Sequence, residues 1–130
     1  MKATPNILNT YTLPVLLIDD DELILDSLSE LLEADGYQVH TANSSAECIA
    51  KISNGIFPDI IITDYRMRNR NGVEVVKSIR NFLDEEIPAI IFTDDTSNKV
   101  REAARQNKCI FLSKPQETNI LANQISAMSA

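Results

Sequence analysis

The chain has 130 residues, of which 44% are hydrophobic and 24% are charged, and its net charge at pH 7 is −7. This size and composition predict one soluble globular domain, and the acidic balance argues against direct binding to nucleic acid, which rests on Lys and Arg. No segment approaches the ~20 apolar residues of a membrane span, and the polar start Met1–Asn6 lacks the apolar core of a signal peptide. The chain is therefore expected to be cytoplasmic and to bind no membrane.

Short apolar runs alternate with stretches of helical period from Leu13 onwards. Residues 1–12 predict a loose N-terminal extension, and the domain itself is expected over residues 13–130, with no effector domain beside it. Each apolar run is rich in Val and Ile and four or five residues long, which is typical of a strand buried on both faces. The predicted strands are Val15–Asp19, Gln38–Ala42, Ile60–Thr63, Ala89–Thr93 and Cys109–Leu112.

Helical patterns follow each of these strands. The first is expected to end near Asp35–Gly36, and the later ones to begin at Ser44 or Ser45, at Asn71–Gly72, at Thr96 or Ser97, and near Glu117. The residues predicted to face inward are Leu23, Ile24, Leu28, Leu31 and Leu32; Ala46, Ile49, Ala50 and Ile52; Val73, Val76, Ile79 and Leu83; Val100, Ala103 and Ala104; and Leu121, Ile125 and Met128.

Five alternations of strand and helix predict an α/β fold of the (βα)5 type, a doubly wound parallel five-stranded sheet with helices on both faces. Cys48 and Cys109 lack the spacing of a zinc site and are expected to be free buried thiols. His40, the only histidine, lies within a predicted strand and is expected to be a surface residue of that strand.

Polar residues stand at the carboxyl ends of four predicted strands, which are Asp19–Asp20, Asp64, Thr93 and Lys114–Pro115. Open α/β sheets bind their ligands at this edge. Clustered carboxylates repel one another by about 3–4 kcal/mol per pair at ~4–5 Å and an effective dielectric constant near 20. A divalent cation such as Mg²⁺ would offset that repulsion. The edge therefore predicts a site for Mg²⁺ and a phosphoryl group, with Lys114 as a cation, Thr93 as a donor and one carboxylate as nucleophile.

These residues resemble the receiver domain of two-component response regulators, the CheY-like superfamily, over about Leu13 to Met128. The resemblance implies a flavodoxin-like strand order 2-1-3-4-5. The matching segments are Leu16-Leu17-Ile18-Asp19-Asp20-Asp21, Ile62-Thr63-Asp64-Tyr65-Arg66-Met67, Asn71-Gly72-Val73-Glu74, Ile91-Phe92-Thr93 and Ser113-Lys114-Pro115.

The resemblance assigns the acidic residues to one metal-assisted acceptor site. Asp64 would be the phosphoacceptor and also a ligand of Mg²⁺. Asp20 would bind the metal directly and Asp19 through water, with the backbone carbonyl of Arg66 as a further ligand. The phosphoryl donor would be the phosphohistidine of a histidine kinase or a histidine phosphotransfer protein. The chain would then be no enzyme beyond catalysing its own phosphorylation and dephosphorylation.

The same resemblance implies a conformational switch. Lys114 would bind the phosphoryl group and Thr93 would be the switch hydroxyl. Thr93 would move towards the phosphoryl group, and Phe111, at the aromatic switch position, would fill the space that it leaves. The surface around the fourth helix and fifth strand would change in response. Homodimerisation through the fourth helix, fifth strand and fifth helix is a further possibility in this family.

Several residues depart from the family pattern. Arg68 stands where proline is usual, and this predicts either a solvated, more mobile loop tip or a basic rim that meets an acidic partner. Asp94 stands where a small residue is usual, and we expect it to slow phosphorylation by small donors. Arg66 and Asp95 occupy the variable positions that flank the site and could pair across its mouth. Asn107 replaces a common glycine at the end of the fourth helix and would tolerate a left-handed conformation.

Two other functions fit parts of the sequence. Asp19-Asp20-Asp21 also matches the Asp-x-Asp pattern of haloacid-dehalogenase-type phosphatases, in which Asp19 would be the nucleophile, although Asp21 is better placed to start a helix. A receiver fold that no longer takes phosphate, acting only as an interaction module, is the second alternative. The residue that carries phosphate, if any does, separates the three readings.

Overall fold

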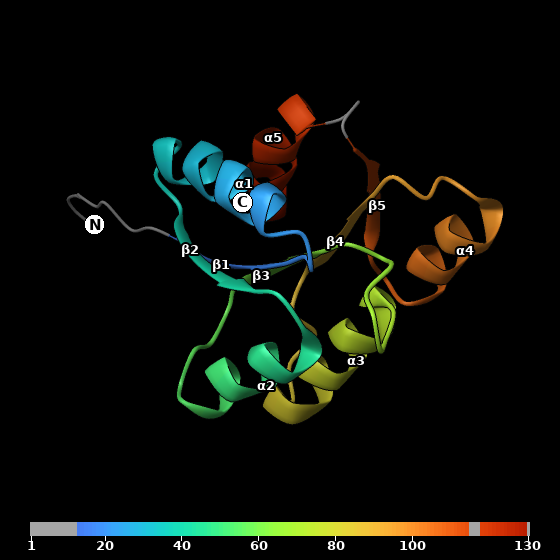
Figure 1. Cartoon of the computed structure of the whole chain (residues 1–130), viewed down its shortest axis with the longest axis horizontal. Helices are drawn as coiled ribbons and strands as arrows, with labels where there is room; N and C mark the ends of the chain where they lie inside the picture. The colour runs from blue at the N-terminus through green and yellow to red at the C-terminus, as the bar shows by residue number, and fades with distance from the viewer. Residues whose placement is uncertain (1–12, 115–117, 130) are drawn as a thin grey trace.

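The computed structural model of the chain describes residues 13–114 and 118–129, and these form five strands alternating with five helices (Figure 1). The expected extension over residues 1–12, Pro115 and the expected helix start near Glu117 lie outside the described residues. The strands are β1 Pro14–Ile18, β2 Gln38–Ala42, β3 Ile60–Thr63, β4 Ala89–Thr93 and β5 Ile110–Ser113. The helices are α1 Glu22–Ala34, α2 Ser45–Ser53, α3 Gly72–Leu83, α4 Asn98–Gln106 and α5 Thr118–Ser129.

The strands form one parallel sheet in the order β2-β1-β3-β4-β5, which confirms the predicted fold class and strand order. The register aligns the carboxyl ends, because Ile18 lies opposite both Ala42 and Thr63. In the same way, Thr93 at the carboxyl end of β4 lies opposite Ser113 at the carboxyl end of β5. Residues that follow β1, β3, β4 and β5 therefore leave the sheet at one edge.

Helices lie on both faces of the sheet (Figure 1), and a cluster of buried apolar side chains lies on each face. Val15 and Leu17 of β1 pack with buried residues of α1 and α5, and the alternate residues Leu16 and Ile18 pack on the opposite face with α2, α3 and α4. Because side chains alternate along a strand, a strand covered on both faces needs apolar residues at every position. This is why β1, β3 and β4 read as unbroken apolar runs.

Three of the five strands have the predicted bounds, and the two others differ from the prediction by one residue at each end. β1 begins at Pro14 and ends before Asp19, and a first strand position suits proline because it needs no amide donor. The carbonyl oxygen of Pro14 accepts a hydrogen bond from the Asp59 amide. β5 includes Ser113 and excludes Cys109, whose amide donates to the carbonyl oxygen of Ala104 at the end of α4.

The inward face of α1 differs from the prediction. Leu25, Leu28 and Leu32 are buried, whereas Leu23 is 77% exposed and Leu31 is 40% exposed. At about 100° per residue, Leu23 lies on nearly the opposite side of the helix from Leu25. The prediction was therefore wrong for Leu23 and Leu31, because several leucine stripes fit this sequence and packing on the sheet selected one.

The buried face of the short helix α2 also differs in part from the prediction, although Ile52 is buried as expected. Cys48 and Ile52, one turn apart, are its buried residues, whereas Ala46 and Ala50 are exposed. The predicted cap was correct, since the hydroxyl of Ser44 accepts a hydrogen bond from the Glu47 amide. Cysteine is a small apolar side chain, and here it takes the core position that was assigned to alanine.

The left-handed residue after α4 is Lys108 rather than Asn107, with φ values of 55° and −108°, respectively. The side chain of Arg80 on α3 donates hydrogen bonds to the carbonyl oxygens of Asn107 and Lys108, at 2.7 and 3.1 Å. This tertiary contact fixes the turn, so the tolerance of asparagine for the left-handed region does not decide which residue adopts it. At the end of α1, by contrast, Gly36 has φ 94° as expected.

The predictions for the two cysteines and the histidine agree with the structure. Cys48 and Cys109 are buried and not bonded to each other. His40 is a partly exposed residue of β2. In the part of the chain that the structure describes, no helix is long and apolar enough to cross a membrane.

Candidate functional site

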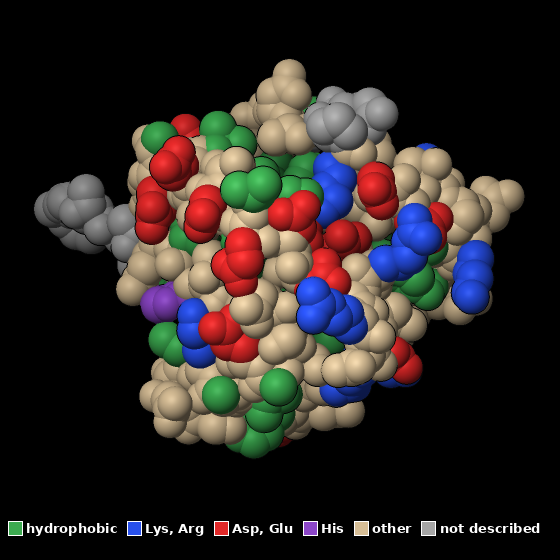
Figure 2. Space-filling view, in the orientation of Figure 1, with side chains coloured by type: hydrophobic (Ala, Val, Ile, Leu, Met, Phe, Trp, Pro, Cys, Tyr) green, Lys and Arg blue, Asp and Glu red, His purple; other side chains and the backbone are tan. Residues whose placement is uncertain are grey.

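The carboxyl edge of the sheet brings together side chains that are far apart in the sequence. Asp19 and Asp20 follow β1, Asp64 follows β3, Thr93 ends β4 and Lys114 follows β5. The backbone fixes these positions, since the amide of Asp64 donates to the carbonyl oxygen of Ile18 and that of Lys114 to the carbonyl oxygen of Thr93. In the view of Figure 2, acidic and basic side chains gather over this edge at the centre of the molecule.

Lys114 contacts two of the acidic residues of the site. Its Nζ lies 2.6 Å from Oδ2 of Asp19 and 3.1 Å from Oδ2 of Asp64, and it donates a hydrogen bond to each. All three side chains are largely buried, with exposed fractions of 10% for Lys114, 5% for Asp19 and 12% for Asp64. Two carboxylates therefore share one ammonium group, and the site retains a net negative charge.

The pKa values reflect this imbalance. Burial raises the pKa of Asp19, and it outweighs the opposing hydrogen bonds from Lys114 and from the Asp21 amide. Burial alone would lower the pKa of Lys114, but its hydrogen bond to Asp19 and the nearby charge of Asp64 together raise it. Lys114 is thus held firmly in its charged form, while one of its two acidic partners is costly to ionise.

The backbone around Asp64 is fixed by close contacts. Its carbonyl oxygen accepts a hydrogen bond from the Thr63 hydroxyl at 2.9 Å. A β-carbon added at Gly72 would lie 2.1 Å from that same oxygen, so only glycine fits there. The amide of Gly72 in turn donates to the carbonyl oxygen of Tyr65 at 2.7 Å. The start of α3 is therefore pressed against the residue that the sequence predicts to be the phosphoacceptor.

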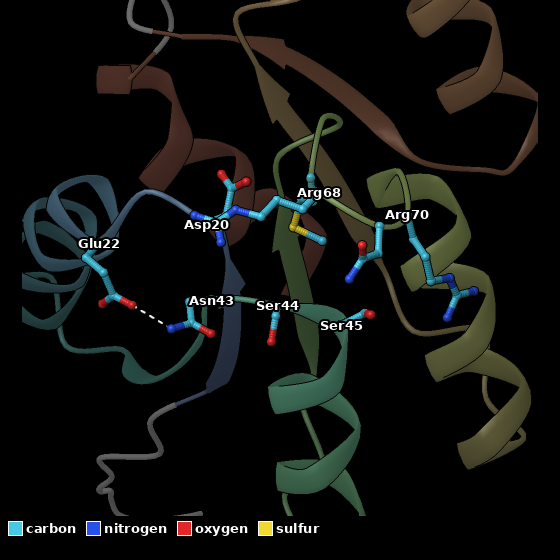
Figure 3. A pocket seen from close by; sticks show the side chains of 9 residues that line it. Asp20, Glu22, Asn43, Ser44, Ser45, Arg68 and Arg70 are labelled. Atoms are coloured by element: carbon cyan, nitrogen blue, oxygen red, sulfur yellow. Dashed lines mark hydrogen bonds between the residues drawn. The ribbon is translucent and has the colours of Figure 1, made fainter.

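Asp20 lies beside the Lys114 cluster rather than in it. Among the described residues, none forms a hydrogen bond or ion pair with its carboxylate, which lines a pocket of about 300 Å³ (Figure 3). No three Asp, Glu, His or Cys side chains of the described part converge closely enough to hold a metal ion. The expected meeting of carboxylates at one point is thus seen for Asp19 and Asp64 only.

The donor set nevertheless fits Mg²⁺. This ion takes one or two carboxylates, keeps several of its waters and accepts only oxygen ligands. Asp20 offers a carboxylate that no described residue engages, and Oδ1 of Asp64 accepts only a 3.4 Å hydrogen bond from the Arg66 amide. Oδ1 of Asp19 is engaged more firmly, at 2.9 Å from the Asp21 amide, which suits contact with the ion through water. Asp20, Asp64 and the Arg66 carbonyl are thus the groups that would hold the ion.

Thr93 and Phe111 belong to the neighbouring strands β4 and β5, where Thr93 lies opposite Ser113 and Phe111 lies opposite Ile91. No hydrogen bond among the described residues joins the Thr93 hydroxyl to the acids. Thr93 is fully buried, and its hydroxyl oxygen accepts a hydrogen bond from the Asp95 amide at 3.2 Å. Phe111 is partly buried, and the guanidinium of Arg101 lies over its ring, 4.5 Å from the centroid. Nε of Arg101 also donates to the carbonyl oxygen of Thr96. Sequence reasoning missed this stacking, since nothing local marks Arg101 among the exposed residues of α4.

An arginine spans the mouth of the site. Nε of Arg66 lies 3.5 Å from Oδ2 of Asp95, and one of its terminal nitrogens lies 3.9 Å from Oδ1 of Asp94. Hydrogen bonds from Ser97, first of all from its amide, lower the pKa of Asp95, and Arg66 adds to this effect. The predicted Arg66–Asp95 pair is present, and it is joined by Asp94. Arg66 and Asp94 are both mostly exposed, so the contact is worth little to stability.

Asp21 caps the first helix, and its carboxylate accepts hydrogen bonds from the amides of Leu23 and Ile24. This agrees with the helix-start interpretation of its sequence position. In the phosphatase pattern Asp21 would have to face the reaction beside Asp19, but its Oδ1 is committed to the helix.

Comparisons with known proteins agree on one family. A family model described as "Response regulator receiver domain" matches residues 15–126. The polar-differentiation response regulator DivK of Brucella ovis is 32% identical over 108 residues, which are 80% of this chain and 85% of the relative. The CAI-1 autoinducer sensor kinase/phosphatase CqsS of Vibrio cholerae is 31% identical over 116 residues, but the chain spans only 17% of its length.

Other relatives are also longer than the matched region, as the chain spans 25% of the transcriptional regulatory protein ZraR of Klebsiella oxytoca, at 31% identity. Among solved structures, the chemotaxis protein CheY4 of Vibrio cholerae superimposes with a TM-score of 0.81 and 28% identity, covering 91% of this chain and 99% of that one.

Proposed function

Because the chain belongs to the response regulator receiver domain family, we propose that Asp64 accepts a phosphoryl group from the phosphohistidine of a kinase or phosphotransfer protein. The observation that carries this proposal is the position of Lys114, whose Nζ lies 3.1 Å from the Asp64 carboxylate in a site that is mostly closed to water. A cation at this position neutralises charge on a phosphoryl oxygen while the acceptor oxygen attacks.

The transfer forms a bond between phosphorus and an Asp64 carboxylate oxygen and breaks the bond between phosphorus and the donor's imidazole nitrogen. The imidazole leaves with the bonding electron pair and takes up a proton from solvent. Mg²⁺, when bound, supplies charge neutralisation and orientation for the phosphoryl oxygens. Asp19 keeps Lys114 charged and oriented from the opposite side.

The switch follows from the hydrogen bond of Thr93. Its hydroxyl accepts from the Asp95 amide, and the same group would be needed as donor to a phosphoryl oxygen on Asp64. Turning inward would release the Asp95 amide and loosen the segment before α4, and Phe111 would move with it. Arg101 holds both this segment and the Phe111 ring, so the change would reach the outer surface of α4. Homodimerisation through α4, β5 and α5 remains a prediction.

The partner would approach over an apolar hollow beside Lys114. This hollow, of about 390 Å³, is lined by Leu23, Ile24 and Leu28 of α1 together with Phe92, Lys114 and Thr118. The exposure of Leu23 suits a surface that is covered when a partner binds. A helical partner seated here would carry its phosphohistidine close to the buried carboxylates.

Intact-mass analysis after incubation with acetyl phosphate and Mg²⁺ tests the proposal. The wild-type chain should gain one phosphoryl group, and Asp64→Ala should gain none. Asp26→Asn removes an exposed carboxylate from α1 and should behave like the wild type. Omission of Mg²⁺ should abolish the adduct.

Peptide mapping then separates the alternatives. A phosphoryl group on Asp19 would point to chemistry of the haloacid dehalogenase kind. A wild-type chain that neither gains an adduct, from acetyl phosphate or from phosphohistidine proteins, nor binds Mg²⁺ would be a receiver fold that acts only as an interaction module.

A further inference from the structure

The loop between β3 and α3 is anchored at both ends and presents its tip to the site. Arg66 and Asn71 form a β-bridge across the loop. The guanidinium of Arg70 donates to the carbonyl oxygen of Glu74 and to the hydroxyl of Ser78, both on α3. The side chain of Asn71 caps α3 in a reciprocal capping box with Glu74. The position of residues 67–69 is therefore set by contacts on both sides of them.

These tip residues form one wall of the 300 Å³ pocket described above (Figure 3). The opposite walls come from Asp20 and Glu22 at the start of α1 and from residues 43–45 at the start of α2. The pocket is therefore a polar cavity between three loops at the carboxyl edge, and Asp20 is the expected metal ligand that lines it.

Of the four charged residues that line this pocket, Glu22 and Arg70 are already engaged. Glu22 accepts a hydrogen bond from the Asn43 side chain at 2.7 Å, and Arg70 is held by α3. Within the described part of the chain, Asp20 and Arg68 make no hydrogen bond or ion pair. Figure 3 shows the Arg68 side chain extending from the loop tip towards Asp20. Among the described residues of the pocket, the Asp20 carboxylate and the Arg68 guanidinium are thus the two charged groups without a hydrogen bond or ion pair.

We propose that Arg68 is a tethered counter-charge for Asp20 that lowers the affinity of the site for divalent cations. The inference rests on the proposed function, in which Asp20 holds the ion. A guanidinium on the same pocket repels an incoming divalent cation and, without metal, partly neutralises the acids. The chain then needs a higher Mg²⁺ concentration to become competent for phosphorylation than it would with an uncharged residue at this position.

Charge repulsion of this kind across several ångströms of partly solvated space predicts about a threefold to tenfold effect on the dissociation constant. The effect should shrink as salt is added, because the Debye length is about 8 Å at 0.15 M ionic strength. A structural role of Arg68 in shaping the loop would not have this salt dependence.

Isothermal titration of the full chain with MgCl₂ alone, at low ionic strength and again at 0.15 M salt, tests the proposal. Arg68→Ala should bind Mg²⁺ about threefold to tenfold more tightly than the wild type at low ionic strength, with a smaller gain in salt. Arg68→Lys keeps the charge and should stay near the wild-type value. Lys77→Ala removes the same charge from an exposed position of α3 outside the pocket, and its affinity should not change.

A second readout separates binding from chemistry. The Mg²⁺ concentration that gives half-maximal phosphorylation by acetyl phosphate should fall in Arg68→Ala by the same factor, while the rate at saturating Mg²⁺ stays constant. Equal affinities of the wild type, Arg68→Ala and Lys77→Ala would overturn the inference and leave the proposed function intact. Failure of every variant and of the wild type to bind Mg²⁺ would overturn both.

Discussion

At the scale of single residues, the site is defined by an unequal count of charges. Asp19 and Asp64 share Lys114, and the three side chains are almost closed to solvent. Removing one partner of a buried ion pair usually destabilises a protein, but here one acid is in excess. The cost of burying it is seen in the raised pKa of Asp19. In the proposed function, this excess negative charge would attract the metal ion.

This excess charge predicts a pH-dependent gain in stability for Asp19→Asn. The folded pKa of Asp19 lies above its ordinary value of 3.8, so its protonation stabilises the fold. That contribution is fully present below pH 3.8 and is lost as the pH rises through the folded pKa. At pH 7 the neutral amide avoids the cost, and the free energy of unfolding should rise by about 1–2 kcal/mol.

Urea unfolding of Asp19→Asn and the wild type, followed by circular dichroism, measures this difference. It should be largest near pH 7 and should narrow towards pH 4. Asp26→Asn, at an exposed position, should show no comparable change at either pH. If Asp19→Asn is less stable than the wild type at pH 7, the bond to Lys114 outweighs the cost of burial.

We expect the charge of Asp94 to slow phosphorylation of the chain by small anionic donors. Its carboxylate is mostly exposed at the mouth of the site, where it repels acetyl phosphate. In Asp94→Ala the rate of phosphorylation by acetyl phosphate should rise by about twofold to fivefold at low salt, and by less at 0.15 M salt. Time-resolved intact-mass measurements would follow the rate. A variant that is phosphorylated no faster than the wild type would rule out this role.

Asp95 should affect the lifetime of the aspartyl phosphate instead. Its carboxylate lies 3.5 Å from Nε of Arg66, and we expect this pair to restrict the access of water to Asp64. Asp95→Ala frees the Arg66 side chain, so we expect hydrolysis to accelerate about twofold to fivefold. The loss of phosphoprotein after removal of the donor measures the lifetime. An unchanged lifetime would mean that the pair does not control the water.

At the scale of elements, the caps and close contacts of helices position the site. Asp21 caps α1 and so turns the chain away from the sheet directly after Asp19 and Asp20. The capping box of α3 and the contact of Gly72 with the Asp64 carbonyl do the same after β3. Each helix start therefore fixes the acid that precedes it, which couples helix capping to the geometry of the acceptor.

Gly72→Ala tests this coupling. The added β-carbon would lie 2.1 Å from the Asp64 carbonyl oxygen, so either α3 or the acceptor must shift. The free energy of unfolding should fall by about 1–3 kcal/mol, as for overpacked sites, and phosphorylation by acetyl phosphate should slow. Thermal and urea unfolding give the stability. Asn81→Ala, at an exposed position of the same helix, should change neither property, and a fully active, equally stable Gly72→Ala would contradict the contact.

At the scale of the whole molecule, two separate openings lie at the carboxyl edge of the sheet. The polar pocket between the three loops reaches Asp20, and the apolar hollow between α1 and Lys114 lies beside it. The first suits a hydrated cation and the second suits the surface of a protein partner. Asp20, which follows β1, lines the first opening, whereas residues of β4 and after β5 line the second.

Leu23 gives a test of the second opening. Leu23→Ala should slow phosphotransfer from a purified phosphohistidine protein that phosphorylates the wild type by about tenfold, in keeping with the loss of one apolar interface anchor. Labelling by acetyl phosphate should not change, since the acceptor is untouched. Leu31→Ala removes an exposed leucine of α1 that does not line the hollow, and should leave both rates near wild type. Equal phosphotransfer to Leu23→Ala and the wild type would place the partner elsewhere.

Much of the fold and of the site could be predicted from the sequence. The apolar runs and the polar residues that end them specify parallel strands whose carboxyl ends meet, because a strand buried on both faces must be apolar throughout. The same pattern predicts that Asp19, Asp64, Thr93 and Lys114 lie at one edge of the sheet. The signals are local, and each is contained within a few residues.

Only the tertiary structure decided which helix face is buried and which residue of a turn adopts the left-handed conformation, where the sequence allows several. It selected Leu25 over Leu23 as a core residue of α1, and it placed Lys108 rather than Asn107 in the left-handed region through the hydrogen bonds of Arg80. It also left Asp20 outside the Lys114 cluster. These outcomes depend on contacts between elements distant in sequence, and a local pattern specifies the faces that an element offers but not the one that its neighbours cover.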